Sequence, residues 1–423
     1  MPTRSRLEAR FLEDIVHFYL NSPDFNGVSL DRLLECREAG ALDALKKLVQ
    51  RELVEVISGK WDNPHIKRLP AYEVAKQLEI LTPDSAEAIC VYPSEKHMRG
   101  TIRSNLYRNR PFTRLLALSH PQIEPNFFEL SVLDRYQSDP RYIFRFDGLA
   151  GSISITDQHY RSRGMVSSDK VILGSFGLGS DARGQKVAVV FLRYLSSLTP
   201  RHQQHWQSQW VRGNCAVEGN YYRRSILGEW TDGISVYDAL LAELFHINAM
   251  CARVGMPPLF IQDFSGERPK GFGLLMRPTR REYHEFAHIL DKLISENLNL
   301  EFFEAEGLSV EGEATRSDGR VEVMRKASLR LLQEWLGMRI RFKVDSGPAR
   351  IMATLREVRA LRQKPAHAMI DDEFSPSYQK EKERLISDVY MSISNIRAFF
   401  QTHPQARDYT VPKDLKFENI VLY

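Results

Sequence analysis

Two histidines four residues apart, in the order His284-Glu-Phe-Ala-His288, are the most explicit chemical signal in the sequence. On a helix, residues four apart lie on one face, so both imidazoles can bind a single Zn²⁺. Glu285 is then placed to act as the general base for a metal-bound water. The pattern predicts zinc-dependent hydrolysis, provided that the fold supplies a third ligand.

Glu304 and Glu306 are the candidates for that ligand, since they follow His288 by sixteen and eighteen residues. Neither glutamate lies in a clear motif, and the charged triplet Arg280-Arg281-Glu282 precedes the histidines. A zinc metallopeptidase with His284, Glu285 and His288 at its centre is therefore one alternative. The other is a polar, exposed helix that binds no metal.

Four amphipathic helices are predicted to position these and other residues, at 279–298, 321–336, 348–369 and 377–400. Each has apolar residues at helical spacing. Helices with one apolar stripe bury it against one another, so we expect a C-terminal four-helix bundle.

The third of these helices ends in Leu361-Arg-Gln-Lys-Pro-Ala-His367, followed by a polar turn and the last helix. This resembles the HEPN family of RNA-acting helical bundles, marked by an arginine, four to six residues and a histidine before the last helix. The resemblance covers about a third of the chain. It implies that Arg362 and His367 form the catalytic pair of an endoribonuclease that needs no metal or cofactor and works as a dimer.

The chemistry of that pair is consistent with the residue types. An arginine can hold a scissile phosphate with two hydrogen bonds, and a histidine can exchange a proton near neutral pH. Nearby basic residues would attract RNA; these are Arg350, Arg356, Arg359 and Lys364. Because Gln363 replaces the family's usual Asn or Asp and Pro365 interrupts the helix, an inactive binding or dimerising bundle is the alternative. In a purely structural role, Arg362 and His367 would interact with the end of their helix.

At the N-terminus, an apolar stripe predicts an amphipathic helix at 6–20; it comprises Leu7, Phe11, Ile15, Phe18 and Tyr19. An extended piece at 26–29 leads to a second helix capped by Ser29. Gly40 separates that helix from a third, which carries Ala41, Leu45, Leu48 and Val49.

Residues 53–57 and 65–69 are predicted to pair as a hairpin around the turn at 58–64. The order helix, short strand, helix, helix, hairpin resembles the winged helix-turn-helix family. The resemblance implies a recognition helix with Lys46, Lys47, Gln50 and Arg51 on its outer side, and a wing with Lys60, Lys67 and Arg68. These side chains suit phosphate and base-edge contacts. A protein-docking module is the alternative, because Asp43 and Glu52 reduce the net positive charge of this helix and its surroundings.

The middle of the chain, residues 71–275, is predicted to be a central α+β domain of unknown role. Strand-like runs at 142–146 and 152–155 flank Asp147-Gly148, which is typical of a hairpin. The apolar run 187–195 is compatible with a strand or the start of a helix, whereas 236–254 has clear helical spacing. The glycine-rich segment 174–179 lacks a phosphate-binding motif, and we expect a mobile surface loop there.

His202 and His205 could contribute to a metal site together with Cys215. We favour a polar helix with Trp206 and Trp210 packed inward. The four cysteines are far apart and form no CxxC pair, which disfavours both a disulfide framework and a thiolate zinc site.

With 423 residues, 43% of them apolar, the chain should fold into several domains. We expect an α+β multidomain protein with a winged helix-turn-helix at 1–70, the central domain at 71–275 and the bundle at 276–423. The net charge of +4 is small, but residues 320–364 contain twelve Lys or Arg and only four Asp or Glu. The sequence contains no run of eighteen apolar residues and no N-terminal signal peptide pattern, so we expect a cytoplasmic protein without a membrane partner.

These features predict a nucleic-acid-binding protein, for RNA or DNA, with a candidate endoribonuclease domain and a homodimer formed through the C-terminal bundle. By family analogy, its setting is bacterial antiviral defence or a stress response. The alternative is a non-catalytic scaffold or regulatory protein that binds nucleic acid and a protein partner.

Overall fold

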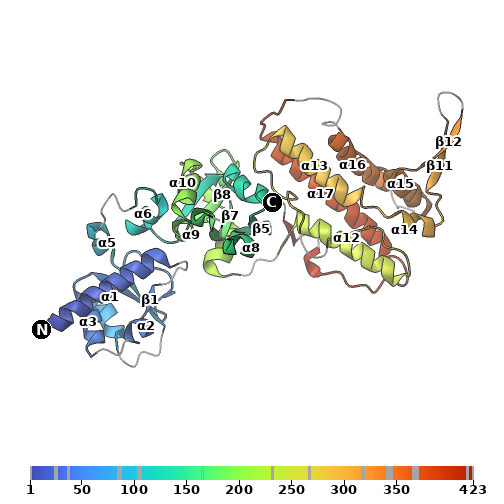
Figure 1. The fold of residues 1–423 in the computed structure, drawn as a ribbon. Coiled ribbons are helices and arrows are strands. Elements are labelled where there is room, and N and C mark those ends of the chain that lie inside the picture. Colours follow the sequence, from blue (N-terminus) through green and yellow to red (C-terminus); the bar gives the residue numbers. More distant parts are fainter. Residues whose placement is uncertain are drawn as a thin grey trace. The chain divides into compact units, whose positions relative to one another are not determined.

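A computed structural model describes residues 2–22, 27–35, 39–82, 88–101, 107–162, 164, 166–229, 233–264, 268–315, 320–339, 346–363, 371–415 and 419–421. Helices account for 51% of the described residues and strands for 17%, so the predicted mixture of α and β structure is confirmed. The chain packs into two compact units (Figure 1). Unit 1 comprises Met1–Phe146 and Ala150–Glu229, and unit 2 comprises Asp147–Leu149 and Trp230–Tyr423. Among the described helices, none has the length and apolar character that a membrane span requires.

Unit 1 begins with helices packed on a small sheet. The elements are α1 (Pro2–Asn21), β1 (Val28–Ser29), α2 (Leu30–Leu34), α3 (Ala41–Gln50), β2 (Val54–Ser58), α4 (Val74–Ile80) and β3 (Ile89–Pro93). As predicted, α1 buries the stripe that contains Phe11 and Ile15, and the Ser29 hydroxyl caps α2 by accepting from the Arg32 amide. Gly40 precedes α3 with a φ of 86°, a conformation that glycine adopts without strain.

The predicted hairpin between 53–57 and 65–69 is wrong in its second strand. β2 pairs instead with β3, which also pairs with β1, and the antiparallel sheet has the order β1-β3-β2. All five residues of β3 are buried, as expected for the central strand of a covered sheet. Residues 65–69 lack such an apolar run, and Lys67 in this segment donates to the Pro93 carbonyl at the end of β3 (2.7 Å).

A six-stranded antiparallel sheet forms the rest of unit 1, with the order β4-β8-β7-β6-β5 and β9 paired to β7. Its strands are β4 (Pro125–Glu129), β5 (Tyr142–Phe146), β6 (Ala150–Ile155), β7 (Ile172–Asp181), β8 (Lys186–Phe191) and β9 (Cys215–Val217). The expected hairpin forms between β5 and β6. Residues 187–195 form a strand and then the start of a helix, so both predicted alternatives occur, because β8 leads directly into α9. The surface loop expected at 174–179 is wrong, because these residues belong to β7 and the stretch 176–179 is buried.

Unit 1 also contains short helices between its strands. They are α5 (Glu95–Thr101), α6 (Pro111–Ala117), η1 (Leu130–Leu133), α7 (Asp134–Ser138), α8 (Asp157–Arg161), η2 (Ser167–Asp169), α9 (Leu192–Ser196), α10 (Pro200–Ser208), α11 (Gly219–Tyr222) and the π-helix η3 (Arg223–Leu227). On α10, His202 and Trp206 are fully buried and both hydrogen-bond to the Tyr136 hydroxyl (2.6 and 3.1 Å). Burial lowers the pKa of His202 to about 4. The prediction that tryptophans pack inward from this helix is confirmed for Trp206.

Unit 2 is built from long helices around one apolar core. Its elements are β10 (Ile234–Ser235), α12 (Val236–Arg253), α13 (Arg280–Ile294), α14 (Leu300–Ala305), β11 (Glu311–Thr315), β12 (Val321–Arg325), α15 (Ser328–Arg339), α16 (Ser346–Gln363), α17 (Ser377–Phe400), η5 (Lys413–Leu415) and β13 (Ile420–Val421). α12 and α16 both pack against α17, and α13 packs against α16 (Figure 1). α17 has the predicted bounds.

The helix expected at 321–336 is wrong in its first part. Residues 321–325 form β12, which pairs with β11 in an exposed hairpin, and the helix begins only at Ser328. Val321 and Val323 alternate with Glu322, a period of two that suits a strand better than a helix. The helix expected at 348–369 is described as far as Gln363, and residues 364–370 lie outside the described part of the chain.

Gly177 on β7 offers a direct test of the packing in unit 1. A Cβ atom at this position would overlap the ring of Tyr221, which is fully buried. We expect Gly177→Ala to lower the free energy of unfolding by about 1–3 kcal/mol through overpacking. Gly100→Ala is the matched control, because a Cβ there meets no atom within 4 Å and alanine favours a helix. Urea denaturation of both variants checks this, and equal stabilities would contradict the packing around Gly177.

Candidate functional site

The two chemical signals of the C-terminal region meet where α13 packs against α16. His284, His288 and Asp291 follow one another at helical spacing and therefore share one face of α13. Arg359 and Arg362 lie in the last turns of α16, and both pair with Asp291. The helix that carries the HExxH motif is thus also the partner of the arginine from the second motif. We call His284, His288, Asp291, Glu296, Arg359 and Arg362 the α13–α16 junction.

Asp291 holds the junction together. Its side chain is fully buried, and Arg362 Nη1 donates to Oδ2 over 2.6 Å while Arg359 Nε lies 3.5 Å from Oδ1. Arg362 also pairs with Glu296, whose side chain is 39% exposed. The hydrogen bonds with Asp291 and Glu296 raise the pKa of Arg362 above its ordinary value. Arg362 is therefore a fixed cation whose charge is balanced by carboxylates.

His284 is oriented by the backbone of α16. Its Nδ1 lies 2.7 Å from the carbonyl oxygen of Leu361, the residue before Arg362. Because a carbonyl oxygen only accepts hydrogen bonds, Nδ1 must carry the proton. In the neutral ring, Nε2 is then the nitrogen that can accept a proton.

The HExxH motif has no completed metal site in the described residues. Glu285 is exposed and pairs with Arg281 (2.8 Å). Glu304 is exposed, and Glu306 accepts from Trp335 and Arg339. Across the described ranges, no three His, Cys, Asp or Glu side chains come together as a metal-binding group. Within the described part of the chain, the zinc alternative therefore lacks a third ligand.

His367 and Lys364 lie outside the described residues, but the chain on either side of them contacts α13. Before the gap, the Leu361 carbonyl bonds to His284. After it, Arg280 pairs with Glu373, and the Asp372 carboxylate accepts from the Arg281 amide (2.9 Å). Both flanks are thus attached to the first two turns of α13, on the helix that carries His284.

The predicted recognition helix, α3, is largely engaged with α1. Lys47 and Arg51 lie 3.6 and 3.2 Å from the carboxylate of Glu8. Lys46 is half-buried and Gln50 is exposed. The outer side of α3 therefore offers less free positive charge than its sequence suggests.

The predicted wing residues have different environments. Lys67 is buried beside Glu55, and burial lowers the pKa of its ammonium group. The expectation that Lys67 lies on an exposed wing is wrong, because the strand that would have exposed it does not form. Lys60 is exposed, as is Arg68 with 43% of its side chain accessible.

Arg68 belongs to a group of cations and aromatic rings that the sequence did not single out. Its guanidinium lies over the Tyr72 ring (4.3 Å) and donates to the Tyr72 hydroxyl (2.8 Å). Lys76 on α4 contacts the rings of both Tyr72 and Trp61 (4.3 and 4.6 Å). We call Trp61, Arg68, Tyr72 and Lys76 the aromatic–cation cluster. The sequence signal that could have found this cluster is the mixture of aromatic and basic residues in 60–76. The predicted strand at 65–69 drew attention away from it.

The remaining basic candidates lie on the exposed side of α16. Arg350 and Arg356 are exposed, and Arg356 donates to the side-chain oxygen of Gln333 on α15. Together with Arg359 at the junction, they place positive charge along one helix.

No match was found when the chain was compared with models of protein families, with curated proteins and with solved structures.

The two acids of the junction should differ in their contribution to stability. Asp291→Ala leaves two arginines without their buried partner, and we expect a loss of about 3–5 kcal/mol. Glu296→Ala removes a solvent-exposed partner of the same Arg362, so the expected loss is below about 1 kcal/mol. Thermal and urea denaturation of the two variants check this, and similar losses would show that Asp291 does not anchor the junction.

Proposed function

We propose that the protein binds nucleic acid through the aromatic–cation cluster and the adjoining basic residues of unit 1. The observation that carries this proposal is the contact of Arg68 and Lys76 with the rings of Trp61 and Tyr72. Cations draw in the phosphate backbone, and aromatic rings and guanidinium planes stack on bases. A surface that combines both is suited to a nucleic acid strand.

The surrounding fold supports the same proposal. α4, which carries Lys76, packs against α3 and β2, so the cluster adjoins the helix that the winged-helix resemblance names as the recognition helix. The sheet order β1-β3-β2 and the succession of α1, β1, α2 and α3 are compatible with a winged helix. In this proposal Lys60 contacts phosphates beside the rings. Arg68 does so in place of the exposed Asp62 carboxylate, which lies 3.6 Å away, and Lys47 and Arg51 do so only by leaving Glu8.

A second activity, metal-independent cleavage of RNA by an HEPN-like unit 2, is favoured by the α13–α16 junction. Arg362 would hold the scissile phosphate in place of the exposed Glu296, while the buried Asp291 keeps the guanidinium oriented. His367 would transfer the proton to or from the 2′-hydroxyl or the leaving group. The attachment of both flanks of 364–370 to α13 supports this location. A homodimer through the helices of unit 2 is part of the same proposal.

Nucleic-acid binding is tested with a fluorescent single-stranded RNA at several salt concentrations. We expect Trp61→Ala to weaken binding about tenfold through lost stacking, and Lys76→Gln to reduce the slope of log K against log salt by about one unit. Arg145→Gln, at an exposed arginine on β5, is the matched control and should bind like the unmodified protein. Equal losses in all three variants, or no binding at low salt, would overturn the proposal.

RNA cleavage is tested in EDTA with a mixed RNA pool. We expect the unmodified protein to cut and His367→Ala to lose about 100-fold or more of the rate, since general acid–base catalysis contributes that much. His403→Ala, at an exposed histidine of the same unit, is the control and should remain active. Activity that disappears in EDTA and returns with Zn²⁺ would refute metal-independent chemistry, as would full activity of His367→Ala.

A further inference from the structure

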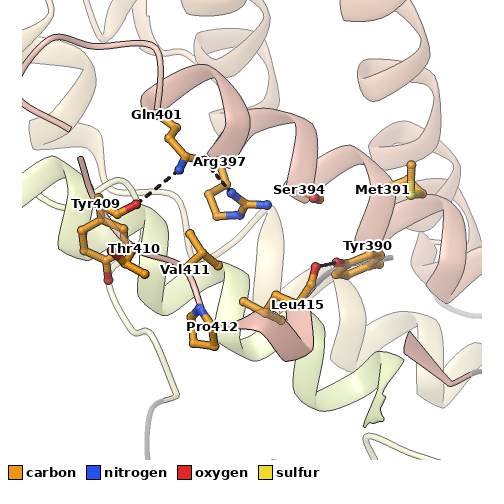
Figure 2. Close-up of a pocket in the computed structure, with 10 residues that line it drawn as sticks. All are labelled: Tyr390, Met391, Ser394, Arg397, Gln401, Tyr409, Thr410, Val411, Pro412 and Leu415. Carbon is orange, nitrogen blue, oxygen red and sulfur yellow. Dashed lines mark hydrogen bonds between the residues drawn. The ribbon is translucent and has the colours of Figure 1, made fainter. Parts of the chain in front are cut away.

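A pocket of about 560 Å³ lies in unit 2 between α17 and the segment that follows it (Figure 2). Its lining comprises Tyr390, Met391, Ser394 and Arg397 of α17, Gln401 just after the helix, and Tyr409, Thr410, Val411, Pro412 and Leu415. The volume falls within the range of small-molecule sites, which is about 300–1,000 Å³. The junction at Asp291 and Arg362 shares none of these residues, so the pocket is a separate feature.

Arg397 provides the fixed polar group of the pocket. Its side chain is only 13% exposed, and its Nε donates to Glu243 of α12, which is fully buried. Its Nη1 donates to the side-chain oxygen of Gln401 (3.1 Å). A guanidinium has five N–H donors, and the described residues accept two of them. Arg397 can therefore offer a pair of N–H donors to a ligand without leaving its partners.

The aromatic rings of the pocket are also held in place. Tyr390 donates its hydroxyl to the Leu415 carbonyl (3.3 Å), and the Tyr409 hydroxyl is bonded to His246 Nδ1 (2.8 Å). Gln401 Nε2 donates to the Tyr409 carbonyl (3.2 Å), which connects the segment to the C-terminal end of α17 (Figure 2). A wall with its side chains already ordered loses little entropy when a ligand binds.

The charge balance of the pocket limits what it can take. The Glu243 carboxylate offsets the Arg397 charge within the protein. An anionic ligand would therefore bring uncompensated charge against apolar side chains such as Val411 and Leu415, which is unfavourable. A neutral molecule with hydrogen-bond acceptors and a flat apolar body suits this lining better.

We propose that this pocket binds a neutral purine nucleoside with two adjacent acceptors on its base, as in guanosine. An arginine fork pairs with the O6 and N7 acceptors of guanine, whereas adenine presents a donor at the position of O6. The half-buried Tyr409 ring and the exposed Pro412 side chain offer flat apolar surface for the base. This inference does not rest on the proposed nucleic-acid binding or RNA cleavage.

The test is calorimetric titration of the full-length protein with guanosine and with adenosine. We expect one guanosine to bind per chain and adenosine to bind at least about tenfold more weakly. The adenine amino group would meet an N–H donor of Arg397 where guanine presents an acceptor. Thr410→Trp fills the pocket from an exposed position and should weaken guanosine binding about tenfold or more. Thr402→Trp, also exposed but outside the lining, is the matched control and should bind normally.

Arg397→Lys supplies a second, independent variant. It keeps a cation beside Glu243 but replaces the planar fork with a single ammonium group, so the preference for guanosine over adenosine should disappear. Melting curves of all variants identify any that fail to fold. The proposal is overturned by the absence of saturable guanosine binding at millimolar concentration, by equal binding of the two nucleosides, or by unchanged binding in Thr410→Trp.

Discussion

A carboxylate that is removed from water must find cationic partners, and in unit 2 the fully buried Asp291 imposes this requirement on its surroundings. Arg359 and Arg362 meet it, which fixes the last turns of α16 against α13. That placement brings the Leu361 carbonyl to His284 and fixes the tautomer of the ring. The candidate residues at this junction are therefore ordered by one buried charge rather than by the apolar core alone.

Ion pairing also decides which cations remain available to a ligand. Glu8 lies beside Lys47 and Arg51 on the outer side of α3, and Lys67 is buried next to Glu55. The connection from β2 to β3 carries three exposed cations, Lys60, Arg68 and Lys76. Arg68 and Lys76 in this connection are exposed to solvent and contact aromatic rings, and the ion pair of Arg68 with Asp62 (3.6 Å) is itself exposed. The net charge of a helix face in the sequence is consequently a poor guide to its role.

The sequence predicted the features that depend on local pattern. The apolar stripes of α1 and α17, the Ser29 cap and the β5–β6 hairpin all follow from neighbouring residues, and the structure has them. It failed where the partner is distant: β2 pairs with β3, more than thirty residues along the chain, and nothing within 53–69 specifies that pairing.

The candidate sites show the same limit. Arg362 and His284 could each be named from a motif, but their meeting depends on Asp291, an acid that no motif singles out. The pocket beside α17 depends on Glu243 and on a segment beyond the helix, and neither has a signature in the sequence. Side chains that position other side chains are recognisable only after the helices are packed.

Arg362 and Arg397 illustrate how a shared device can serve different ligands. Each guanidinium is oriented by a buried acid from a neighbouring helix, Asp291 on α13 or Glu243 on α12. They differ in the second partner, which is the exposed carboxylate of Glu296 for Arg362 and the neutral amide of Gln401 for Arg397. A phosphate can replace Glu296 with little change in local charge, because one anion substitutes for another. At Arg397 an anion would add charge instead, so this site selects for hydrogen-bond geometry, and the two arginines suit a charged and a neutral ligand respectively.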